Sequence, residues 1–501
     1  MQNYYITTYG CQMNKSDSER IATVLENVGY KVCSKEEDAD LIVVVSCSVR
    51  QTAVDRIYGR GVKYKKLEKE NPNLKTILTG CLLDEDKKKL ADKFDVICDI
   101  REIEKISDLI KCKKIVIPRL TRDPEFTKFC LNNWIPPVST IPSRTRRSEA
   151  ESSLGGHQVP CLPCLPDRQA AGRRNDKKVI DCVFRQSEPI DSIHNKKKLD
   201  YSYLSIPPKH SSLFKAYIPI MTGCNNFCSY CVVPYTRGRE YSRPADEILN
   251  EARQLIQNGY KEITLIGQNV NSYNGKINFP SLLREINFIP GDFWIRFATS
   301  HPKDMSDELI TTISECEKIT PYIHLPIQSG SDKILKAMNR KYTKNHYLNL
   351  IKKIKSKIPN VMLSTDIIVG FPNETEADFN ETVDVFKKVK YSMAYIAKYS
   401  TRKGTVAGSL ADNVTQEEKA RRENVLTDIL KQTALENNKK FIGKTVKVLI
   451  EKKFGNYYIG KTDQFINVKV DLSERRDAQV SSVVFINCKI MKVASFGMEA
   501  K

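Results

Sequence analysis

Three closely spaced cysteines in the middle of the chain constrain its fold more than any other feature. Cys224, Cys228 and Cys231 are separated by three and then by two residues. An apolar, strand-like run at 216–221 leads into them, and Gly223 allows the backbone to turn sharply where that strand ends. Cysteine thiolates hold iron–sulfur cubanes, one sulfur to each iron. Because no fourth cysteine lies nearby, a cubane bound here would keep one iron open for another ligand.

Two other interpretations of these cysteines are weaker. A structural zinc site would need a fourth cysteine or histidine, and the nearest histidine, His210, lies before the strand. Three buried core cysteines would be poorly matched to their polar neighbours Asn225, Asn226 and Ser229. Spaced cysteines in chains that stay in a reducing compartment usually bind metal or take part in catalysis. The spacing therefore predicts an iron–sulfur cluster with an open coordination position.

The residues around the cysteines carry a family resemblance. The pattern C-x-x-x-C-x-x-C after a strand resembles the radical S-adenosylmethionine superfamily. The longer string G-C-N-N-F-C-S-Y-C-V-V-P-Y-T-R-G-R-E, at 223–240, resembles the methylthiotransferases that modify transfer RNA. The resemblance implies that S-adenosylmethionine chelates the open iron, and that an electron from the cluster splits it into methionine and a 5′-deoxyadenosyl radical. In such enzymes the cofactor carries the chemistry and the protein positions it.

Length, charge and cysteine content indicate how many domains to expect, what kind of partner the protein has and where in the cell it is found. A chain of 501 residues is expected to form about two to four domains. Its 80 lysines and arginines against 60 acidic residues give a net charge of +20, which suits a polyanionic partner. The first ten residues do not resemble a signal peptide, and no apolar run approaches the ~18 residues of a membrane span. Together with 15 cysteines, these features predict a cytoplasmic protein that uses cysteine for metal rather than for disulfides.

The amino-terminal part, residues 1–118, is predicted to be a parallel α/β domain. Three apolar runs in it predict strands at 4–9, 41–45 and 74–78. Cys11, Cys47 and Cys81 each stand just past one of these strands and before a helical pattern. The carboxyl ends of parallel strands line one crevice, so these thiols are expected to converge. Ser16 and Glu19 fit a capping box, which predicts that the first helix begins at about residue 17.

The other cysteines of this domain are interpreted differently. Cys33 and Cys98 fit small core residues, and Cys112 receives no role. Ordinary burial also remains an alternative for the three converging cysteines. The strings Y-G-C-Q-M-N at 9–14, S-C-S-V-R at 46–50 and T-G-C at 79–81 are similar to the amino-terminal domain of the methylthiotransferases. That resemblance implies that Cys11, Cys47 and Cys81 hold a second [4Fe–4S] cluster, which is implicated in sulfur supply.

Residues 119–200 interrupt this pattern. The segment is rich in proline, serine and arginine and has no hydrophobic periodicity, so it is predicted to be a linker or insertion without a core of its own. Cys161 and Cys164 form a C-x-x-C pair, but no second pair or histidine couple completes a metal site. The family has only a short connection here. A lineage-specific insertion and a gene-model artefact both remain open.

The central part, residues 201–438, predicts six strand–helix repeats. This pattern indicates a (β/α)6 partial barrel with its chemistry at the carboxyl ends of the strands. The turns at those ends, L-I-G-Q-N-V-N-S-Y, S-H-P, L-P-I-Q-S-G-S and D-I-I-V-G-F-P, match the family. The resemblance implies four contacts to S-adenosylmethionine: Gln268, Ser329, Asp366 and Gly370. His301 is either a general base or a loop-fixing histidine beside Pro302, and no catalytic side chain is assigned beyond the clusters.

The last part, residues 439–501, predicts a small antiparallel β-barrel. Short alternating runs suggest strands at 446–451, 457–461, 466–470 and 483–493. The string G-K-T-V-K-V-L-I-E resembles the TRAM domain, a nucleic-acid-binding barrel. Tyr458 and Phe465 either stack on bases or cover the barrel core. Five lysines supply positive charge for phosphates: Lys447, Lys452, Lys453, Lys461 and Lys469.

Together the resemblances imply a radical enzyme with two [4Fe–4S] clusters and S-adenosylmethionine. The expected reaction adds a methylthio group to C2 of N6-isopentenyladenosine beside the anticodon. The expected partner is the anticodon stem-loop of tRNA, with an electron donor and a sulfur source whose identities the sequence does not reveal. Sibling enzymes act on threonylcarbamoyladenosine or on an aspartate of a ribosomal protein, but V-V-P-Y-T-R-G-R-E favours the isopentenyl branch. A non-catalytic iron–sulfur protein that binds RNA is the alternative from another class.

Overall fold

The computed structural model describes residues 2–48, 51–111, 115–116, 201–471 and 485–501. The predicted insertion lies outside the described residues, and with it Cys161 and Cys164; Cys112 also lies outside them. The described parts form an α/β protein with a parallel amino-terminal sheet, a central set of strand–helix units and a closed carboxy-terminal barrel. This is the predicted fold class. Within these parts, no helix is both long enough and apolar enough to cross a membrane.

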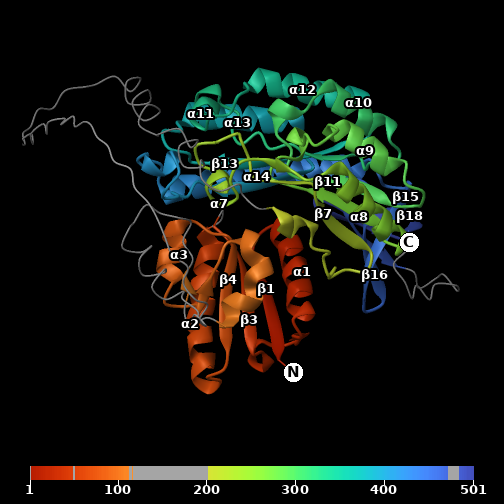
Figure 1. Ribbon diagram of the computed structural model, residues 1–501. Helices are drawn as coiled ribbons and strands as arrows, with labels where there is room; N and C mark the ends of the chain where they lie inside the picture. The colour runs from red at the N-terminus through yellow and green to blue at the C-terminus, as the bar shows by residue number, and fades with distance from the viewer. Residues whose placement is uncertain (1, 49–50, 112–114, 117–200, 472–484) are drawn as a thin grey trace, which may run out of the picture. The chain divides into compact units, whose positions relative to one another are not determined.

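The amino-terminal sheet has six parallel strands. Their order is β2 (Lys31–Val32), β1 (Asn3–Thr8), β3 (Leu41–Cys47), β4 (Lys75–Cys81), β5 (Val96–Ile97) and β6 (Ile115–Val116). Every residue of β3 is buried, as its continuous apolar run predicts. Its residues alternate between two cores, with Val43 on the side of helix α1 (Gln12–Asn27) and Val44 on the side of α2 (Gln51–Glu70). Figure 1 shows α1 on one face of the sheet, with α2 and α3 (Asp84–Leu90) on the other.

Helix α1 begins earlier than the capping pattern predicted. Its N-cap is Cys11, so Ser16 and Glu19 lie inside the helix and are buried. The Ser16 hydroxyl accepts a hydrogen bond from the Arg20 guanidinium at 2.6 Å instead of capping the helix. The Glu19 carboxylate accepts one from the Ser211 backbone N–H at 3.0 Å. The prediction was wrong because Ser16 bonds to Arg20 one turn further along the helix and Glu19 bonds to Ser211 far away in sequence, and a local pattern cannot distinguish these partners from a cap.

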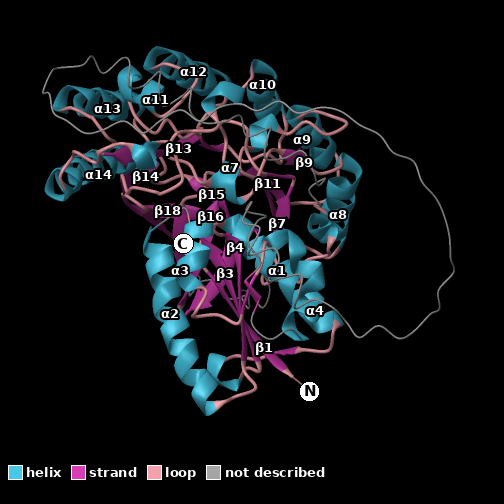
Figure 2. Cartoon of the chain, turned by 60° about the vertical axis from the view of Figure 1, so that its left-hand side comes forward, coloured by secondary structure: helices cyan, strands magenta, loops and turns pink. Residues whose placement is uncertain are grey.

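The central part contains the six predicted strand–helix units. Its strands form two parallel sheets, β7 (Lys215–Pro219), β10 (Glu262–Ile266) and β11 (Trp294–Phe297), and β12 (Tyr322–His324), β13 (Met362–Val369) and β14 (Met393–Lys398). One parallel bridge, from Ile295 to Ile319, connects β11 to the segment before β12. In Figure 2 the helices lie outside the strands; they are α8 (Ala245–Gln257), α9 (Phe279–Asn287), α10 (Asp307–Glu315), α11 (Asp332–Ala337), α12 (Lys344–Lys357) and α13 (Glu376–Val389). A single hydrophobic cluster joins both sheets to these helices. The long helix α14 (Gln416–Lys439) follows.

The carboxy-terminal barrel has five strands in a closed order. They are β15 (Thr445–Phe454), β16 (Tyr457–Thr462), β17 (Asn467–Asp471), β19 (Gly497–Ala500) and β18 (Phe485–Ala494). The sequence predicted four of these strands and missed β19, because four residues are too few to show an alternating pattern. The pairing of β17 with β19 is parallel, so the barrel is not antiparallel throughout as predicted. Met362 of β13 belongs to the hydrophobic cluster of the barrel, which therefore packs on the central part.

Candidate functional site: two sets of three cysteines

The first set of cysteines lies on one loop, between β8 (Met221–Thr222) and α7 (Val233–Thr236). Gly223 has a φ of +81°, and a Cβ there would lie 2.0 Å from the carbonyl oxygen of Arg239. Only glycine fits this turn. The Gly223 N–H donates to Oε1 of Gln268 at 2.6 Å, and the Cys231 N–H donates to the Cys228 carbonyl at 2.9 Å. The loop is therefore held in one conformation before any ligand is considered.

The surroundings of these sulfurs suit thiolate ligands of a cluster. Asn226 Nδ2 lies 3.5 Å from Cys224 Sγ, and the buried guanidinium of Arg340 lies 3.6 Å from Cys228 Sγ. Burial raises the pKa of Cys224 to about 11, so the protein alone does not keep it as a thiolate. A metal centre supplies the positive charge that does so. Donors aimed at cysteine sulfurs are also one of the means by which proteins tune iron–sulfur clusters.

The second set of cysteines lies where three separate segments meet. Cys11 is the N-cap of α1, while Cys47 ends β3 and Cys81 ends β4. Cys47 and Cys81 are register partners in the parallel ladder. Gly80 has a φ of +105°, and a Cβ there would lie 2.5 Å from the Ser46 carbonyl oxygen of the neighbouring strand. The structure thus brings together the three strand-end cysteines that the sequence singled out.

Each set offers three cysteine sulfurs, the number that a cubane with one open iron would use. Among the residues that the structure describes, no three His, Cys, Asp or Glu side chains are placed to share one metal ion. In a cubane each cysteine binds a different iron, so its three sulfurs need not meet at one point. Both sets are nevertheless electrostatically close, because Cys11 and Cys47 raise the pKa of Cys81, and Cys228 and Cys224 raise that of Cys231. In each case burial has the larger effect.

Three polar residues around the second set were missed by the sequence analysis. The Oδ1 atom of Asn14 lies 3.9 Å from Cys11 Sγ and 3.7 Å from Cys81 Sγ. Arg237 Nε lies 2.9 Å from Cys81 Sγ, and its Nη2 donates to Asp17 Oδ2 at 2.6 Å. The side chains of Arg237 and Asp17 are each 1% exposed. Asn14 lies in the string at 9–14 and Arg237 in the string at 223–240. Their place in these family motifs was the only feature of the sequence that could have identified them.

Arg237 joins the two sets of cysteines. It lies six positions after Cys231, so its backbone belongs to the loop of the first set and its guanidinium to the second. Burial alone would lower the pKa of Arg237, but Asp17 and Cys81 raise it well above its ordinary value. The guanidinium therefore stays charged.

The four residues predicted to contact S-adenosylmethionine have different surroundings. Gln268 holds Gly223, as described above. Ser329 is completely buried and accepts a hydrogen bond from the Ser331 N–H at 3.2 Å. The Gly370 N–H donates to Glu374 Oε2 at 2.6 Å. The Asp366 side chain is 40% exposed and lines a cavity. Three of the four thus already hold loops at strand ends, and Asp366 opens toward solvent.

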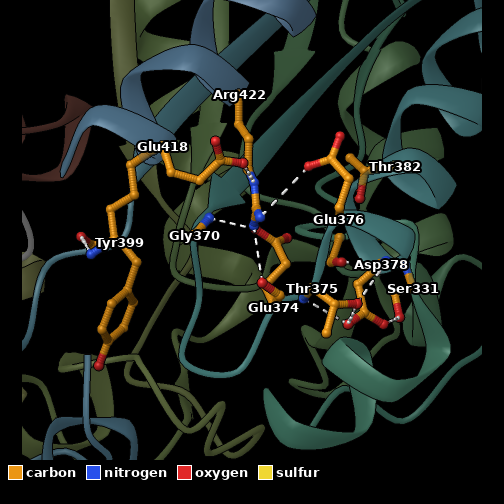
Figure 3. A network of polar contacts seen from close by, with 12 residues as sticks. Ser331, Gly370, Glu374, Thr375, Glu376, Asp378, Thr382, Tyr399, Glu418 and Arg422 are labelled. Atoms are coloured by element: carbon orange, nitrogen blue, oxygen red, sulfur yellow. Dashed lines mark hydrogen bonds and ion pairs between the residues drawn. The ribbon is translucent and has the colours of Figure 1, made fainter. Parts of the chain in front are cut away.

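The turn after β13 is supported by the polar network of Figure 3. The Glu374 carboxylate accepts from the Gly370 N–H and from Arg422 Nη1, the latter at 2.7 Å. Burial raises the pKa of Glu374, although Gly370 and Arg422 oppose this shift. Arg422 also donates to Glu418 of α14 at 2.6 Å. The turn that carries Gly370 is thereby tied to the long carboxy-terminal helix of the core.

A second part of the same network supports the segment that contains Ser329. Asp378 accepts a hydrogen bond from Ser331 at 2.7 Å (Figure 3). It also accepts one from Lys333 at 2.8 Å. It also completes a capping box with Thr375 at the start of α13. Burial would raise the pKa of Asp378, but these hydrogen bonds lower it below its ordinary value. The carboxylate is therefore ionised at neutral pH.

A cavity of about 940 Å³ brings residues of all three described parts together. Cys11 and Cys47 of the amino-terminal part line it, as does Asp366 of the core. The barrel contributes Phe465, whose ring centroid lies 5.0 Å from that of Tyr322. Tyr458 is instead buried in the barrel core, so the core-covering alternative holds for it. The cavity is large enough for a nucleoside-sized ligand.

His301 has the structural role that the sequence left open as an alternative. Its Nδ1 accepts a hydrogen bond from the Lys303 N–H at 3.2 Å and fixes the turn after β11. Burial, with smaller effects from Arg340 and Lys303, lowers the pKa of His301 to about 2. The imidazole is therefore neutral at physiological pH.

Comparison with known proteins identifies the family to which the chain belongs. Residues 218–386 match the model of the Radical SAM superfamily, and residues 3–100 match that of Uncharacterized protein family UPF0004. The chain is 37% identical to the tRNA-2-methylthio-N(6)-dimethylallyladenosine synthase of Clostridium tetani (strain Massachusetts / E88), across 99% of this chain and 96% of that relative. It is 40% identical to the protein of the same name from Thermoanaerobacter pseudethanolicus, across 89% of this chain and 82% of that relative. A solved structure of the cobalamin-dependent S-adenosylmethionine radical enzyme OxsB gives a TM-score of 0.46 at 11% identity, over 87% of this chain and 56% of that chain.

Proposed function

This chain belongs to the family of tRNA-2-methylthio-N(6)-dimethylallyladenosine synthases, and we propose that it adds a methylthio group to C2 of N6-isopentenyladenosine beside the anticodon of tRNA. Membership of the radical SAM superfamily implies a [4Fe–4S] cluster and S-adenosylmethionine. One observation carries the proposal. Cys11 and Cys47 of the amino-terminal set line the same cavity as Asp366 of the radical SAM core, so the proposed sulfur site opens onto a space that one of the proposed cofactor contacts also lines.

The proposed roles of the residues around the first set follow from their contacts. When bound at Cys224, Cys228 and Cys231, a cluster with S-adenosylmethionine would supply the radical that removes hydrogen from an unreactive carbon. Gln268 holds the turn at Gly223 in place. The turns at Ser329 and Gly370, with the carboxylate of Asp366, border the proposed cofactor site at the strand ends.

The proposed second cluster is held by Cys11, Cys47 and Cys81, where the sulfur for transfer would be supplied. The donor set fits such a group, because three thiols converge and a guanidinium donates to one of them. Cys11 is exposed and opens this site to the cavity, while Cys47 and Cys81 are buried. The electron donor and the source of replacement sulfur would be separate partners.

The carboxy-terminal barrel is proposed to bind the tRNA backbone. Lys452, Lys453 and Lys469 are exposed and free of burial costs for a phosphate contact. Lys447 instead pairs with Asp292 at 2.7 Å, and Lys461 is half-buried beside Phe465. Only part of the predicted set of lysines is therefore well placed. A tRNA substrate also agrees with the cytoplasmic location expected from the sequence.

Mass spectrometry of tRNA nucleosides from a deletion strain tests the proposal. The methylthio form should disappear and N6-isopentenyladenosine should accumulate, and a plasmid carrying the intact gene should restore the modification. A plasmid encoding the Cys224→Ala variant serves as the matched control and should not restore it. Loss of the methylthio form of threonylcarbamoyladenosine, or of a modified ribosomal aspartate, would identify a sibling activity instead. Unchanged nucleosides and an unchanged ribosomal protein would favour the non-catalytic alternative.

A further inference from the structure

Arg237 has more buried polar contacts than the stability of the fold requires. It forms a completely buried ion pair with Asp17, whose other oxygen, Oδ1, has no hydrogen-bond partner within the described part of the chain. A buried ion pair is often no more stabilising than well-packed apolar side chains of the same volume. Asn14 and Tyr203 also take part, at 3.2 Å and 3.4 Å from the guanidinium. Three polar groups thus hold one side chain against Cys81.

The Arg237 guanidinium presents to the Cys81 sulfur an N–H that is both fixed in direction and permanently charged. Nε lies 2.9 Å from Cys81 Sγ, while Nη2 donates to Asp17 Oδ2 at 2.6 Å. Arginine has a rigid planar fork and does not deprotonate in proteins, so the donor keeps its direction and its charge. A lysine ammonium in the same space would be a point charge on a flexible stem and would lack this orientation.

The chemical consequence concerns any cluster bound through Cys81. Hydrogen bonds to ligand sulfurs and the net charge around a cluster set its reduction potential. A charged N–H donor withdraws electron density from the thiolate and stabilises the reduced form more than the oxidised form. The Asp17 carboxylate has the opposite effect, but it is bonded to the guanidinium, whereas the guanidinium itself contacts the sulfur. The two charges therefore act in opposite directions with unequal strength.

We propose that Arg237 is a positioning residue for the amino-terminal cysteine set, which orients Cys81 and raises the reduction potential of the cluster bound there. Asp17 moderates this effect and holds the guanidinium in place. The inference rests on the proposed function, because it requires a cluster at Cys11, Cys47 and Cys81. It goes further in assigning the electronic control of that cluster to a residue from the loop of the other cysteine set.

The test uses full-length protein with Cys224, Cys228 and Cys231 replaced by alanine, reconstituted so that only the amino-terminal set can hold iron. The midpoint potential of its cluster is measured by a redox titration followed by electron paramagnetic resonance. Arg237→Gln should shift the potential to more negative values, and Asp17→Asn should shift it to more positive values. The double variant should shift it in the same direction as Arg237→Gln, but less. A merely structural role would not produce opposite signs.

Arg239→Gln is the matched control. It removes the same charge two positions along the same loop, where the Arg239 side chain lies over the ring of Phe227 at 4.5 Å. Its potential should equal that of the parent. The Asp17→Asn/Arg237→Gln variant contains no unpaired buried charge, so it keeps the test decisive if Arg237→Gln alone does not fold.

The possible results separate the two levels of the proposal. A parent protein that binds no iron would overturn the second cluster and, with it, the role of Arg237. Iron bound normally with equal potentials in the parent and in the Arg237 variants would overturn only the inference about Arg237. An equal shift in the Arg239→Gln control would also overturn it, because the effect would then come from general charge rather than from the contact with Cys81.

Discussion

Each of the two sets consists of three cysteines, but the sets are built in different ways. Cys224, Cys228 and Cys231 lie within one short loop whose turns are closed by its own backbone and by Gln268. Cys11, Cys47 and Cys81 come from three chain segments and meet only because β3 and β4 pair in register beside the start of α1. The first set is contiguous in sequence, although Met338, Asn339 and Ala407 also hold its loop, while the second depends on a complete sheet. Their sensitivity to change should differ accordingly.

The sets also differ in where their charged partners come from. Arg340, near the first set, belongs to the same core and also donates to the Pro326 carbonyl at 2.6 Å. Arg237, near the second set, is supplied from 156 positions beyond Cys81 in the chain. The amino-terminal set is therefore complete only when the core is docked on it. The amino-terminal set thus depends on the loop that carries Cys224, Cys228 and Cys231, and no contact among the described residues makes that loop depend on the amino-terminal set.

The largest effect should come from removing one set at a time. Replacing Cys224, Cys228 and Cys231 by alanine should leave about half of the iron and abolish formation of 5′-deoxyadenosine, because each three-cysteine set is proposed to hold one cubane. Replacing Cys11, Cys47 and Cys81 should also leave about half of the iron but allow cofactor cleavage without methylthiolation. Iron analysis and product analysis by chromatography measure both outcomes. If either replacement removed all of the iron, the two sets would not be independent.

A second prediction concerns stability. Arg237→Gln should lower the free energy of unfolding by about 3–5 kcal/mol, because it leaves the carboxylate of Asp17 buried without its partner. Denaturant unfolding of the apo-protein measures this value. Asp17→Asn/Arg237→Gln should recover most of it, and Arg239→Gln should cost far less. Equal losses for the two arginines would show that the ion pair does not stabilise the junction.

A smaller effect is expected where the core supports its own loops. Asp378→Asn should cost about 1 kcal/mol through loss of the capping box at α13. The pKa of Asp378 is lowered in the folded state, so its contribution is present above the unfolded pKa and is lost as the pH falls through the folded value. The difference from wild type should therefore shrink below about pH 4. A difference that grew in acid would contradict the assigned direction.

The same variant sharpens the comparison of the two sets. Asp378 holds Ser331 in the segment that contains Ser329, so Asp378→Asn should weaken S-adenosylmethionine binding. It should leave the iron content of the amino-terminal set unchanged. Isothermal titration of the reconstituted protein with S-adenosylmethionine and iron analysis provide the two measurements. A loss of iron from the amino-terminal set would show a coupling that the contacts do not explain.

The smallest effect is expected at His301. Its pKa of about 2 keeps the imidazole neutral, so it titrates outside the physiological range. His301→Asn preserves an acceptor for the Lys303 N–H and should leave the rate and pH profile of cofactor cleavage between pH 6 and 9 almost unchanged. A loss of ~10²–10⁴-fold, the usual size of a general base effect, would reverse this interpretation.

The sequence alone determined the features that repeat locally. Six alternating apolar and helical patterns predicted the core, and the positions of Cys11, Cys47 and Cys81 after strands predicted their convergence. Both succeeded because parallel strands always present their carboxyl ends on one edge. The spacing of Cys224, Cys228 and Cys231 likewise needs only a loop, whose turn requires the glycine that precedes it.

Only the tertiary structure decided which groups those features would meet. Arg237 had no assigned role within its motif, but packing buries it against Cys81 and Asp17. Ser16 and Glu19 matched a cap, but both lie inside α1, where Glu19 bonds to Ser211 of the core. Tyr458 and Phe465 were equivalent in sequence, and closure of the barrel buried one and turned the other toward the cavity. The physical reason is the same throughout: spacing along the chain encodes local conformation, whereas burial and charge pairing depend on residues far away in sequence that meet only in the folded protein.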